Sequence, residues 1–245
     1  MNCKKTALVT GASRGIGAAI ADKLASEGYD LFLTCSNSLE DLTNIASAIK
    51  EKYNIECEFK KCDAGDPAQV KALFEEDFFK EKGLDVLVNN AGISYVGLLH
   101  EMADEDWERV ISVNLGSVFY HSKYAVSIML KKHSGKIINI SSVWGSAGAS
   151  TEVAYSASKG GVEAFTRSLA KELAPSGICV NALACGLIDT KMNSCFSKED
   201  LCGVIEEIPC DRIGTAEEVA QAVYKLIEMP DYLTGQIVKI DGGWI

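Results

Sequence analysis

Short apolar runs alternate with longer amphipathic segments along the whole chain. The apolar runs are typical of buried strands and lie at residues 5–10, 29–35, 55–62, 84–90, 135–141, 178–184 and 235–241. The longer segments have helical spacing and lie at residues 15–28, 38–53, 67–83, about 104–131, about 152–174 and about 215–229. Alternation of this kind requires crossover connections, so it predicts an α/β fold: a doubly wound parallel sheet of about seven strands with helices on both faces.

Composition narrows the class of protein. The 245 residues are 47% hydrophobic and 24% charged and include no Ser/Gly-rich linker, which predicts a single domain over residues 1–245. No segment approaches the roughly 18 apolar residues of a membrane span, and the first residues do not form a signal peptide. Nine cysteines lack zinc-ligand spacing, so we expect free thiols, no metal site and a cytoplasmic location. A formal net charge of −10 argues against nucleic-acid binding.

Glycines cluster directly after the first predicted strand, in the segment TGASRGIG at 10–17. Gly11, Gly15 and Gly17 have the spacing G-x-x-x-G-x-G and open the first predicted helix. Glycine permits a tight turn and lets backbone N–H groups approach a phosphate, while a helix N-terminus favours negative charge. A ligand-free strand–helix turn is the plain alternative, but the position at the first strand of an α/β alternation favours a dinucleotide pyrophosphate site.

The end of the second predicted strand bears on which dinucleotide binds. An NAD site usually places Asp or Glu there, about 20 residues after the glycines, to hold the ribose 2′-hydroxyl. The segment TCSNS at 34–38 has no acid, and Arg14 in the glycine loop can pair with a 2′-phosphate, helped by Ser36 or Asn37. We therefore expect NADPH, against the alternative that Arg14 is an ordinary solvated side chain.

The segment YSASK at 155–159 places a phenol and an ammonium on one helix face. Tyr155 and Lys159 are four residues apart, and the small residues between them leave room for a ligand. A neighbouring cation favours the phenolate, so we expect Lys159 to lower the pKa of Tyr155 from its ordinary value of about 10. Tyr155 would then donate and accept protons near neutral pH. Taken alone, the pair is also compatible with an ordinary helix surface.

Several other segments accompany this pair in a fixed order. They are TGASRGIG, NNAG at 89–92, Asn114 in VNLGSVF, Ser142 in INISS, and DGG at 241–243. On these motifs the chain resembles the short-chain dehydrogenase/reductase family over essentially its whole length. The resemblance implies a Rossmann-type fold and NAD(P)-dependent oxidation or reduction at a carbonyl or alcohol.

The resemblance implies four catalytic residues. Tyr155 would give its proton to the carbonyl oxygen as hydride arrives, and Ser142 would hydrogen-bond and position that oxygen. Lys159 would support the tyrosine and bind the nicotinamide ribose, and Asn114 would hold a water for a proton relay. This chemistry is physically consistent, because hydride addition creates an alkoxide that aimed donors stabilise, while the cofactor supplies the hydride.

The resemblance also implies cofactor contacts spread along the chain. Asp63 would bind the adenine amino group. The adenosine ribose would be lined by Asn89, Ala91 and Gly92. Ile188 and Thr190 would contact the nicotinamide half. A structural strand end is the alternative for NNAG. The full predicted cofactor-binding set is Gly11, Ser13, Arg14, Gly15, Ile16, Gly17, Ser36, Asn37, Asp63, Asn89, Ala91, Gly92, Tyr155, Lys159, Gly186, Ile188 and Thr190.

Residues 186–212 form the longest stretch without clear periodicity, and we expect a substrate lid there. The family usually has Pro-Gly just before this stretch, where this chain has Cys185 and Gly186. Proline stiffens a turn, so its loss would loosen the lid. The Cys185 thiol is either a reactive group or a small spacer, and we favour the spacer.

Within the family, the chain most resembles bacterial 3-oxoacyl-[acyl-carrier-protein] reductases. The resemblance rests on TGASRGIG, SLAKELAPSGICVNALACG and RIGTAEEVA. It implies NADPH-dependent reduction of a 3-oxoacyl thioester, linked to acyl carrier protein or CoA, to a 3-hydroxyacyl thioester. An acidic carrier needs a basic docking surface, and the candidates, which are otherwise solvated helix ends, are Lys131, Lys132, Lys136, Arg167 and Lys171.

Other functions stay open at this point. Trp144 and the segment GASTEV at 148–153 resemble Firmicute reductases of elongation factor P, which reduce a 5-aminopentanone group on a modified lysine. A small-molecule ketone or hydroxysteroid reductase is a third candidate. A catalytically silent Rossmann sensor is a fourth, which the presence of all four catalytic residues disfavours. The family resemblance also implies a homotetramer.

Overall fold

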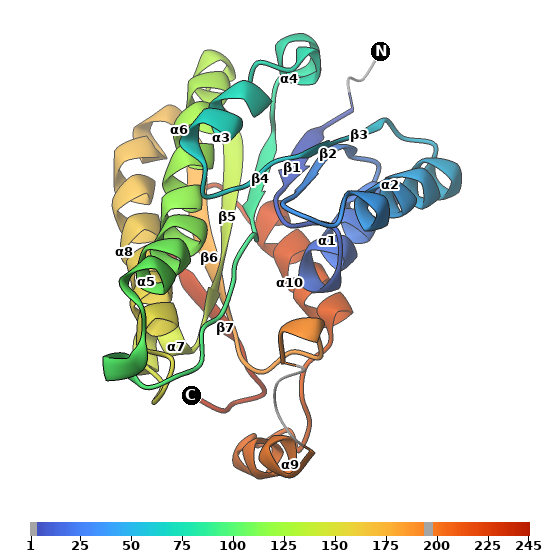
Figure 1. The fold of residues 1–245 in the computed structure, drawn as a ribbon. Helices are drawn as coiled ribbons and strands as arrows, with labels where there is room; N and C mark the ends of the chain where they lie inside the picture. The colour runs from blue at the N-terminus through green and yellow to red at the C-terminus, as the bar shows by residue number, and fades with distance from the viewer. Residues whose placement is uncertain (1–3, 194–197) are drawn as a thin grey trace.

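A computed structural model describes residues 4–193 and 198–245. Seven strands form one sheet in the order β3-β2-β1-β4-β5-β6-β7 (Figure 1). Every neighbouring pair is parallel, which confirms the predicted Rossmann-type, doubly wound α/β sheet. The strands are β1 (Thr6–Val9), β2 (Asp30–Cys35), β3 (Cys57–Lys61), β4 (Val86–Asn89), β5 (Gly135–Ser142), β6 (Ile178–Cys185) and β7 (Ile237–Ile240).

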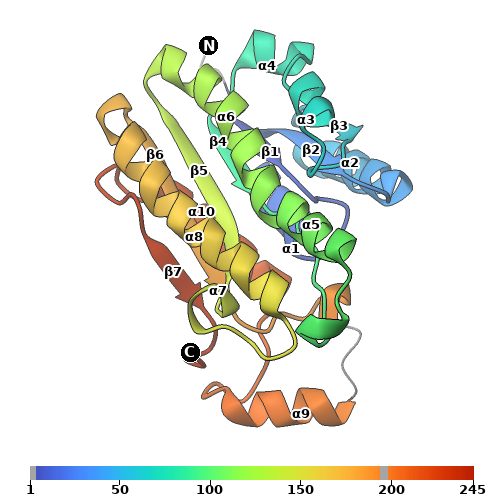
Figure 2. The ribbon, with the colours of Figure 1, turned by 60° about the vertical axis from the view of Figure 1, so that its left-hand side comes forward.

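Helices cover both faces of the sheet (Figures 1 and 2). One layer contains α1 (Gly15–Ser26), α2 (Leu39–Tyr53) and α10 (Ala216–Glu228). The opposite layer contains α3 (Pro67–Leu73), α4 (Asp77–Lys82), α5 (Asp104–Ile111), α6 (Ser117–Met129) and α8 (Val153–Leu173). Two further helices, α7 (Trp144–Ala147) and α9 (Lys198–Glu207), lie at the carboxyl end of the sheet. Of the helices that the structure describes, none has the length and apolar character to cross a membrane.

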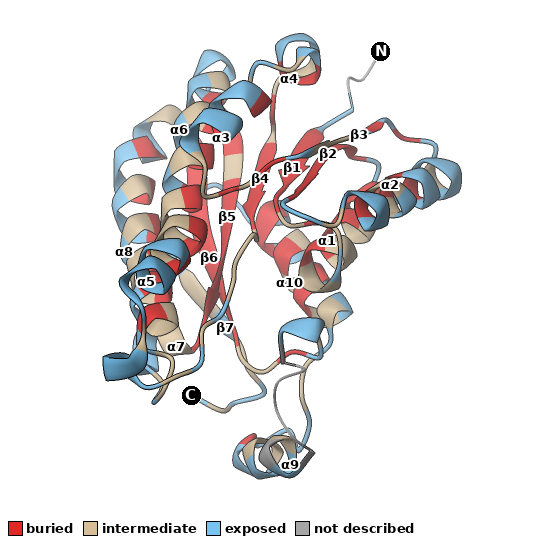
Figure 3. Ribbon diagram, viewed as in Figure 1, coloured by how far each residue is buried: buried red, intermediate tan, exposed pale blue. Residues whose placement is uncertain are grey.

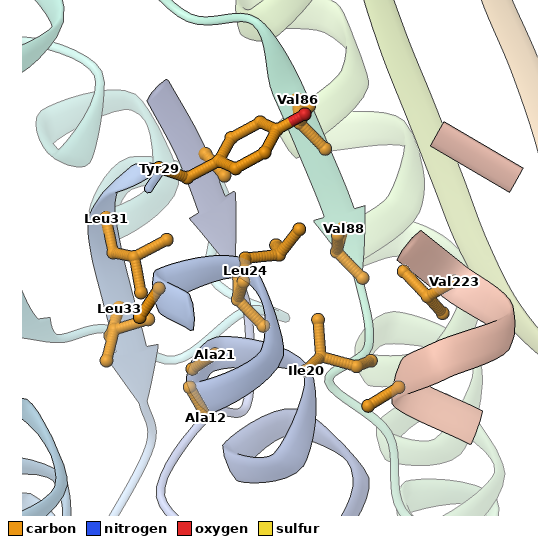
Figure 4. Packing of buried hydrophobic residues seen from close by; sticks show 14 of the residues in the cluster. Ala12, Ile20, Ala21, Leu24, Tyr29, Leu31, Leu33, Val86, Val88 and Val223 are labelled. Carbon is orange, nitrogen blue, oxygen red and sulfur yellow. The ribbon is translucent and has the colours of Figure 1, made fainter. Parts of the chain in front are cut away.

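The five inner strands are mostly apolar and buried because both faces of the sheet are covered, whereas the edge strands β3 and β7 are partly exposed (Figure 3). On the α1 face, Ile20 and Leu24 pack against Leu31 and Leu33 of β2, and Val223 of α10 closes the cluster (Figure 4). Complete burial of one such leucine side chain contributes roughly 1.5–3 kcal/mol. This packing fixes the direction in which α1 leaves the glycine loop.

The segment 67–83 forms two helices where its pattern predicts one. Helix α3 ends before Phe74, and α4 begins at Asp77. The break allows the ring of Phe74 to stack on Phe79 at 5.2 Å between centroids, while Phe79 also packs on Phe32 at 5.0 Å. Tertiary packing of aromatic rings has therefore overridden the continuous helical spacing.

The predicted helix near 104–131 contains an interruption of its own. A π-helical segment, η2 (Ser112–Gly116), joins α5 to α6, and a 3₁₀ turn, η3 (Leu130–Lys132), ends the run. The predicted lid, residues 186–212, contains the 3₁₀ turn η5 (Lys191–Asn193) and helix α9, with residues 194–197 outside the described part. Short π segments are frequent at functional sites, and η2 contains Asn114.

Candidate active site

A large cavity of about 850 Å³ lies at the carboxyl ends of the strands. Because all seven strands run the same way, the segments that follow β1, β2, β4, β5 and β6 meet at one edge of the sheet. The cavity collects almost the whole predicted set of site residues, namely Gly11, Ser13, Arg14, Gly15, Ile16, Gly17, Ser36, Asn37, Asp63, Ala91, Gly92, Ser142, Tyr155, Lys159, Gly186, Ile188 and Thr190. Asn89 and Asn114 lie outside its lining.

The glycine loop forms a closely packed cradle at one end of the cavity. Gly11 has φ +67°, a left-handed conformation that favours glycine. A Cβ at Gly17 would overlap the Gly11 carbonyl oxygen and lie 2.5 Å from Asn90 Nδ2. Asn90 Nδ2 donates to the carbonyl oxygens of Thr10 and Gly11 at 2.9 and 3.1 Å, which holds the loop against the end of β4. The loop leads into the N-terminus of α1, so its geometry fits a pyrophosphate.

The end of β2 lies beside this cradle. The Ala12 N–H donates to the Thr34 carbonyl oxygen at 2.9 Å, which joins the glycine loop to β2. Arg14 is exposed, and it lines the cavity with Ser36 and Asn37. The side chains that follow β2 are therefore uncharged, and the cation beside them belongs to Arg14.

Asp63 follows the end of β3 and lines another part of the cavity. Its Oδ2 lies 2.9 Å from Arg109 Nη1 of α5, and its Oδ1 accepts from the Gly65 N–H at 3.0 Å. Arg109 also lines the cavity, and it was missed from the sequence because its partner lies on a distant segment. The ion pair fixes the Asp63 carboxylate in an orientation that leaves oxygen lone pairs for an amino donor.

Asn89, which is predicted to contact a ribose, lies outside the residues that line the cavity. It is buried, and its Nδ2 donates to Asn139 Oδ1 at 2.8 Å in the neighbouring strand. The next residue, Asn90, reaches the cavity instead. Side chains alternate between the two faces of a strand, and Asn89 belongs to the face that packs on α6 and β5. The Asn89 side chain therefore joins β4 to β5 and α6, and its contact with a ribose stays a prediction.

Ser142, Tyr155 and Lys159 converge on one wall of the cavity. Ser142 ends β5, whereas the other two lie in the first two turns of α8. Ser142 and Tyr155 share a side-chain hydrogen bond. Lys159 is buried, donates from Nζ to the Ile140 carbonyl oxygen at 2.9 Å, and lies 5.6 Å from the centroid of the Tyr155 ring. A hydroxyl, a phenol and an ammonium therefore share one small volume.

Burial dominates the titration of this group. It raises the pKa of Tyr155 above its ordinary value, and the hydrogen bond with Ser142 acts in the opposite direction. Burial lowers the pKa of Lys159 to about 8. The expected lowering of the Tyr155 pKa by Lys159 is therefore wrong for this structure. The phenol holds its proton at neutral pH, which suits a group that donates a proton.

Comparison with known proteins agrees with this geometry. The family model for short chain dehydrogenase matches residues 5–200. The chain belongs to the short-chain dehydrogenase family. It is 41% identical over 240 residues to a 3-oxoacyl-[acyl-carrier-protein] reductase of Aquifex aeolicus and 40% identical over 240 residues to one of Escherichia coli, covering 98% of this chain and 96% of each relative. It is also 35% identical over 241 residues to an uncharacterized oxidoreductase, YmfI, of Bacillus subtilis, covering 98% of each chain.

This short-chain dehydrogenase is an oxidoreductase, and its family uses a nicotinamide cofactor. The glycine cradle fits such a cofactor, because the Gly17 position has no room for a side chain and the loop opens directly onto a helix N-terminus. Gly11, Gly17 and Asp63 would hold its adenosine diphosphate half. Lys159 and Thr190 line the same cavity, and their contacts with the nicotinamide half stay a prediction.

Asn114 supports the catalytic helix of this short-chain dehydrogenase from behind. Its Oδ1 accepts from the Ile93 N–H at 2.8 Å, and its Nδ2 donates to the Ile93 carbonyl oxygen at 2.9 Å and to Ser158 Oγ at 3.0 Å. Ser158 Oγ in turn donates to the Tyr155 carbonyl oxygen at 2.7 Å. Both amide hydrogens of Asn114 are thus used. Its side chain therefore positions α8 through Ser158, and its role of holding a water for a proton relay stays a prediction.

The lid and the Cys185 turn complete the far side of the cavity. Thr190, Leu201, Val204 and Glu207 line it from residues 186–212. Cys185 is buried, and burial raises the pKa of its thiol to about 12. A thiol with this pKa is almost entirely protonated near pH 7, so the chemistry favours the predicted spacer over a reactive nucleophile.

Proposed function

We propose that this oxidoreductase uses NADPH to reduce the carbonyl of a 3-oxoacyl thioester to a hydroxyl. The observation that carries the proposal is the convergence of Ser142, Tyr155 and Lys159 on a cavity whose other end is a phosphate cradle. When bound, NADPH supplies the hydride. The hydride adds to the carbonyl carbon. The three side chains supply a proton and hydrogen-bond donors at the carbonyl oxygen, where negative charge develops.

Each side chain has a distinct part in the proposed reduction. The Ser142 and Tyr155 hydroxyls, which already share a hydrogen bond, would both donate to the carbonyl oxygen. Tyr155 would transfer its proton as negative charge develops there. Lys159, with a pKa of about 8, is mostly protonated at neutral pH and would stabilise the resulting phenolate. Asn114 would keep α8 in register through Ser158.

The named relatives support the thioester as substrate. A third one, a 3-oxoacyl-[acyl-carrier-protein] reductase of Staphylococcus aureus, is 40% identical over 244 residues, which cover 99% of both chains. Identity at this level across the full length favours the same class of carbonyl substrate for this chain.

The basic surface that was predicted for carrier docking does not fit this role. Lys136 is the second residue of β5 and Ser142 is the last, so about 20 Å of strand separates them at about 3.3 Å per residue. Lys136 is also paired with Asp231 at 2.6 Å. The same displacement from the cavity applies to the rest of the set: Lys131, Lys132, Arg167 and Lys171. An acidic carrier would have to dock at the mouth of the cavity, where Lys191 lies.

Two carboxylates in the cavity favour a second candidate substrate, the 5-aminopentanone group of elongation factor P. Glu152 and Glu207 both line the cavity, at the start of α8 and the end of α9. The amine of such a group would be positively charged and would be attracted by carboxylates, whereas an acidic carrier would be repelled.

The first test follows NADPH consumption with an acetoacetyl thioester and, in parallel, with an aliphatic ketone that carries an amine. Faster reduction of the thioester would support the first proposal, and faster reduction of the amine-bearing ketone would support the second. Reduction of neither, with NADPH still bound, would refute both substrates and leave the cofactor site standing.

Arg14→Ala tests the choice of cofactor. Loss of a charged hydrogen-bond partner of the 2′-phosphate should weaken NADPH binding by about 10- to 100-fold and leave NADH binding almost unchanged. Titration of protein fluorescence with each cofactor measures both affinities. Lys71→Ala, which removes an exposed cation of α3 outside the cavity, is the charge-matched control. Equal loss for both cofactors would contradict the assignment of Arg14.

A homotetramer is a further proposal. Trp107 of α5, Phe119 of α6 and Val153 of α8 are between 40% and 48% exposed on one layer of the molecule. Exposed apolar side chains of this size are typical of interfaces between subunits. Light scattering on the purified protein tests the proposal, and a monomer would refute it.

A further inference from the structure

The last residues of the chain return to the substrate end of the cavity. After β7, the Asp241 carboxylate accepts from the Gly243 and Ile245 N–H groups at 3.0 and 3.1 Å. Gly242 and Gly243 have φ +69° and +86°, which favour glycine. This turn directs Trp244 into the cavity wall, where it is partly buried.

The Trp244 indole contacts two parts of the cavity wall that are far apart in the sequence. Its ring lies 4.9 Å from the ring of Trp144, centroid to centroid, at an interplanar angle of 67°. Its Nε1 donates to Glu207 Oε2, at the end of lid helix α9, at 3.2 Å. The backbone N–H of Trp144 donates to Ser142 Oγ at 3.2 Å, so Trp144 is connected to the reaction centre. Trp244 therefore links the lid to the wall that holds Ser142.

A second contact fastens the tail to the segment that follows α9. The Cys210 N–H donates to the Gly242 carbonyl oxygen at 3.2 Å. Ile208 is buried, and a Cβ on Gly242 would lie 2.8 Å from its Cγ2 atom. The backbone contact locates the end of α9, which leaves the indole to set how closely the helix approaches the cavity.

We propose that Trp244 is a specificity-determining residue that holds α9 over the substrate and sets the width of the cavity beside Ser142. This inference rests on the proposed carbonyl reduction, because an effect of Trp244 on substrate binding requires that the protein reduces such a substrate. The part of the substrate beyond the carbonyl passes between the Trp144–Trp244 pair and the lid residues Leu201 and Val204. The wall is therefore apolar and aromatic, and it takes its final shape only when the Trp244–Glu207 bond is made.

Two single variants and their combination test the bond. Trp244→Phe keeps an aromatic ring and removes the N–H, and Glu207→Leu removes the acceptor. Each should raise KM for the acetoacetyl thioester, which carries no amine for Glu207 to attract, by about 10-fold, as expected for a hydrogen bond to a charged group, with kcat nearly unchanged. Because both remove the same bond, the double variant should be no worse than either single one. Glu207→Gln, which keeps a carbonyl acceptor, should recover most of the loss.

A readout without substrate separates this inference from the proposed function. Amide hydrogen exchange over residues 198–207 should be faster in both single variants, by a similar factor, and the affinity for NADPH should not change. Tyr232→Phe, at a fully exposed aromatic ring outside the cavity, is the control and should leave exchange at wild-type rates.

Three results would overturn the inference: additive effects in the double variant, unchanged exchange in α9, or NADPH affinity falling as strongly as KM rises. A wild-type protein that reduces neither test ketone would refute the proposed function alone. Exchange in α9 would still decide whether Trp244 holds the lid.

Discussion

Tyr155→Phe should lower the turnover of a ketone substrate by about 100- to 10,000-fold, which is the range for loss of a general acid. Phenylalanine fills the same space and removes only the hydroxyl, so the donor aimed at the carbonyl oxygen is lost while the helix is kept. Ser142 remains in place, because its Oγ still accepts from the Trp144 N–H at 3.2 Å. NADPH consumption at saturating substrate measures the effect.

Tyr232→Phe is the matched control, since that side chain is fully exposed. It should turn over at the wild-type rate, and both variants should bind NADPH normally. A Tyr155→Phe protein that keeps wild-type turnover would show that the proton comes from elsewhere. Water held near Lys159 would then be the first alternative to examine.

Gly17→Ala should weaken cofactor binding by about 5- to 150-fold, because overpacking of this kind costs roughly 1–3 kcal/mol. The added Cβ would overlap the Gly11 carbonyl oxygen, which belongs to the loop that would hold the phosphates, and would crowd the Asn90 side-chain amide that holds this loop. Because the Gly11 carbonyl is backbone, the loop itself must move. Fluorescence titration with NADPH measures the loss.

Gly203→Ala provides the comparison for a helical glycine. In the part of the chain that the structure describes, no atom lies within 4 Å of a Cβ placed there. Alanine favours a helix over glycine by about 1 kcal/mol, so this variant should be neutral or slightly more stable. Thermal unfolding of both variants shows whether Gly17→Ala remains folded. Normal NADPH binding by a folded Gly17→Ala protein would contradict the assignment of the cradle.

The layers of the fold could be predicted because local patterns determine them. Strands such as 84–90 and 178–184 are mostly apolar, and they are buried between the two helix layers. The glycine spacing at 11, 15 and 17 was informative for a similar reason, since a close backbone approach leaves no other residue type possible.

Features that depend on tertiary contacts could not be predicted. Arg109 reaches Asp63 across 46 residues, and no spacing rule relates them. Asn89 and Asn90 look alike in the sequence, but a strand sends one into the core and the other into the cavity. Trp244 directly follows the DGG motif, but no local pattern predicts its contacts, because its partners lie on two distant segments.

The pKa of Tyr155 depends on burial as well as on the nearby ammonium of Lys159, and sequence spacing reveals only the ammonium. Four-residue spacing indicates that Lys159 is near Tyr155, and the ring centroid is indeed 5.6 Å from Nζ. Spacing does not reveal that both groups are withdrawn from water. Desolvation disfavours both charged forms, and it outweighs their mutual attraction.

The strand order also determines at which point of synthesis both edges of β1 can be paired. β1 pairs with β2 on one side and with β4 on the other, and the second pairing joins Ala7 to Val86. A nascent chain that has released only the first three strands therefore exposes one edge of β1, an apolar strand able to pair with other chains. Contacts between residues so distant in sequence form slowly. We expect slow refolding from denaturant and the greatest risk of aggregation before β4 is in place.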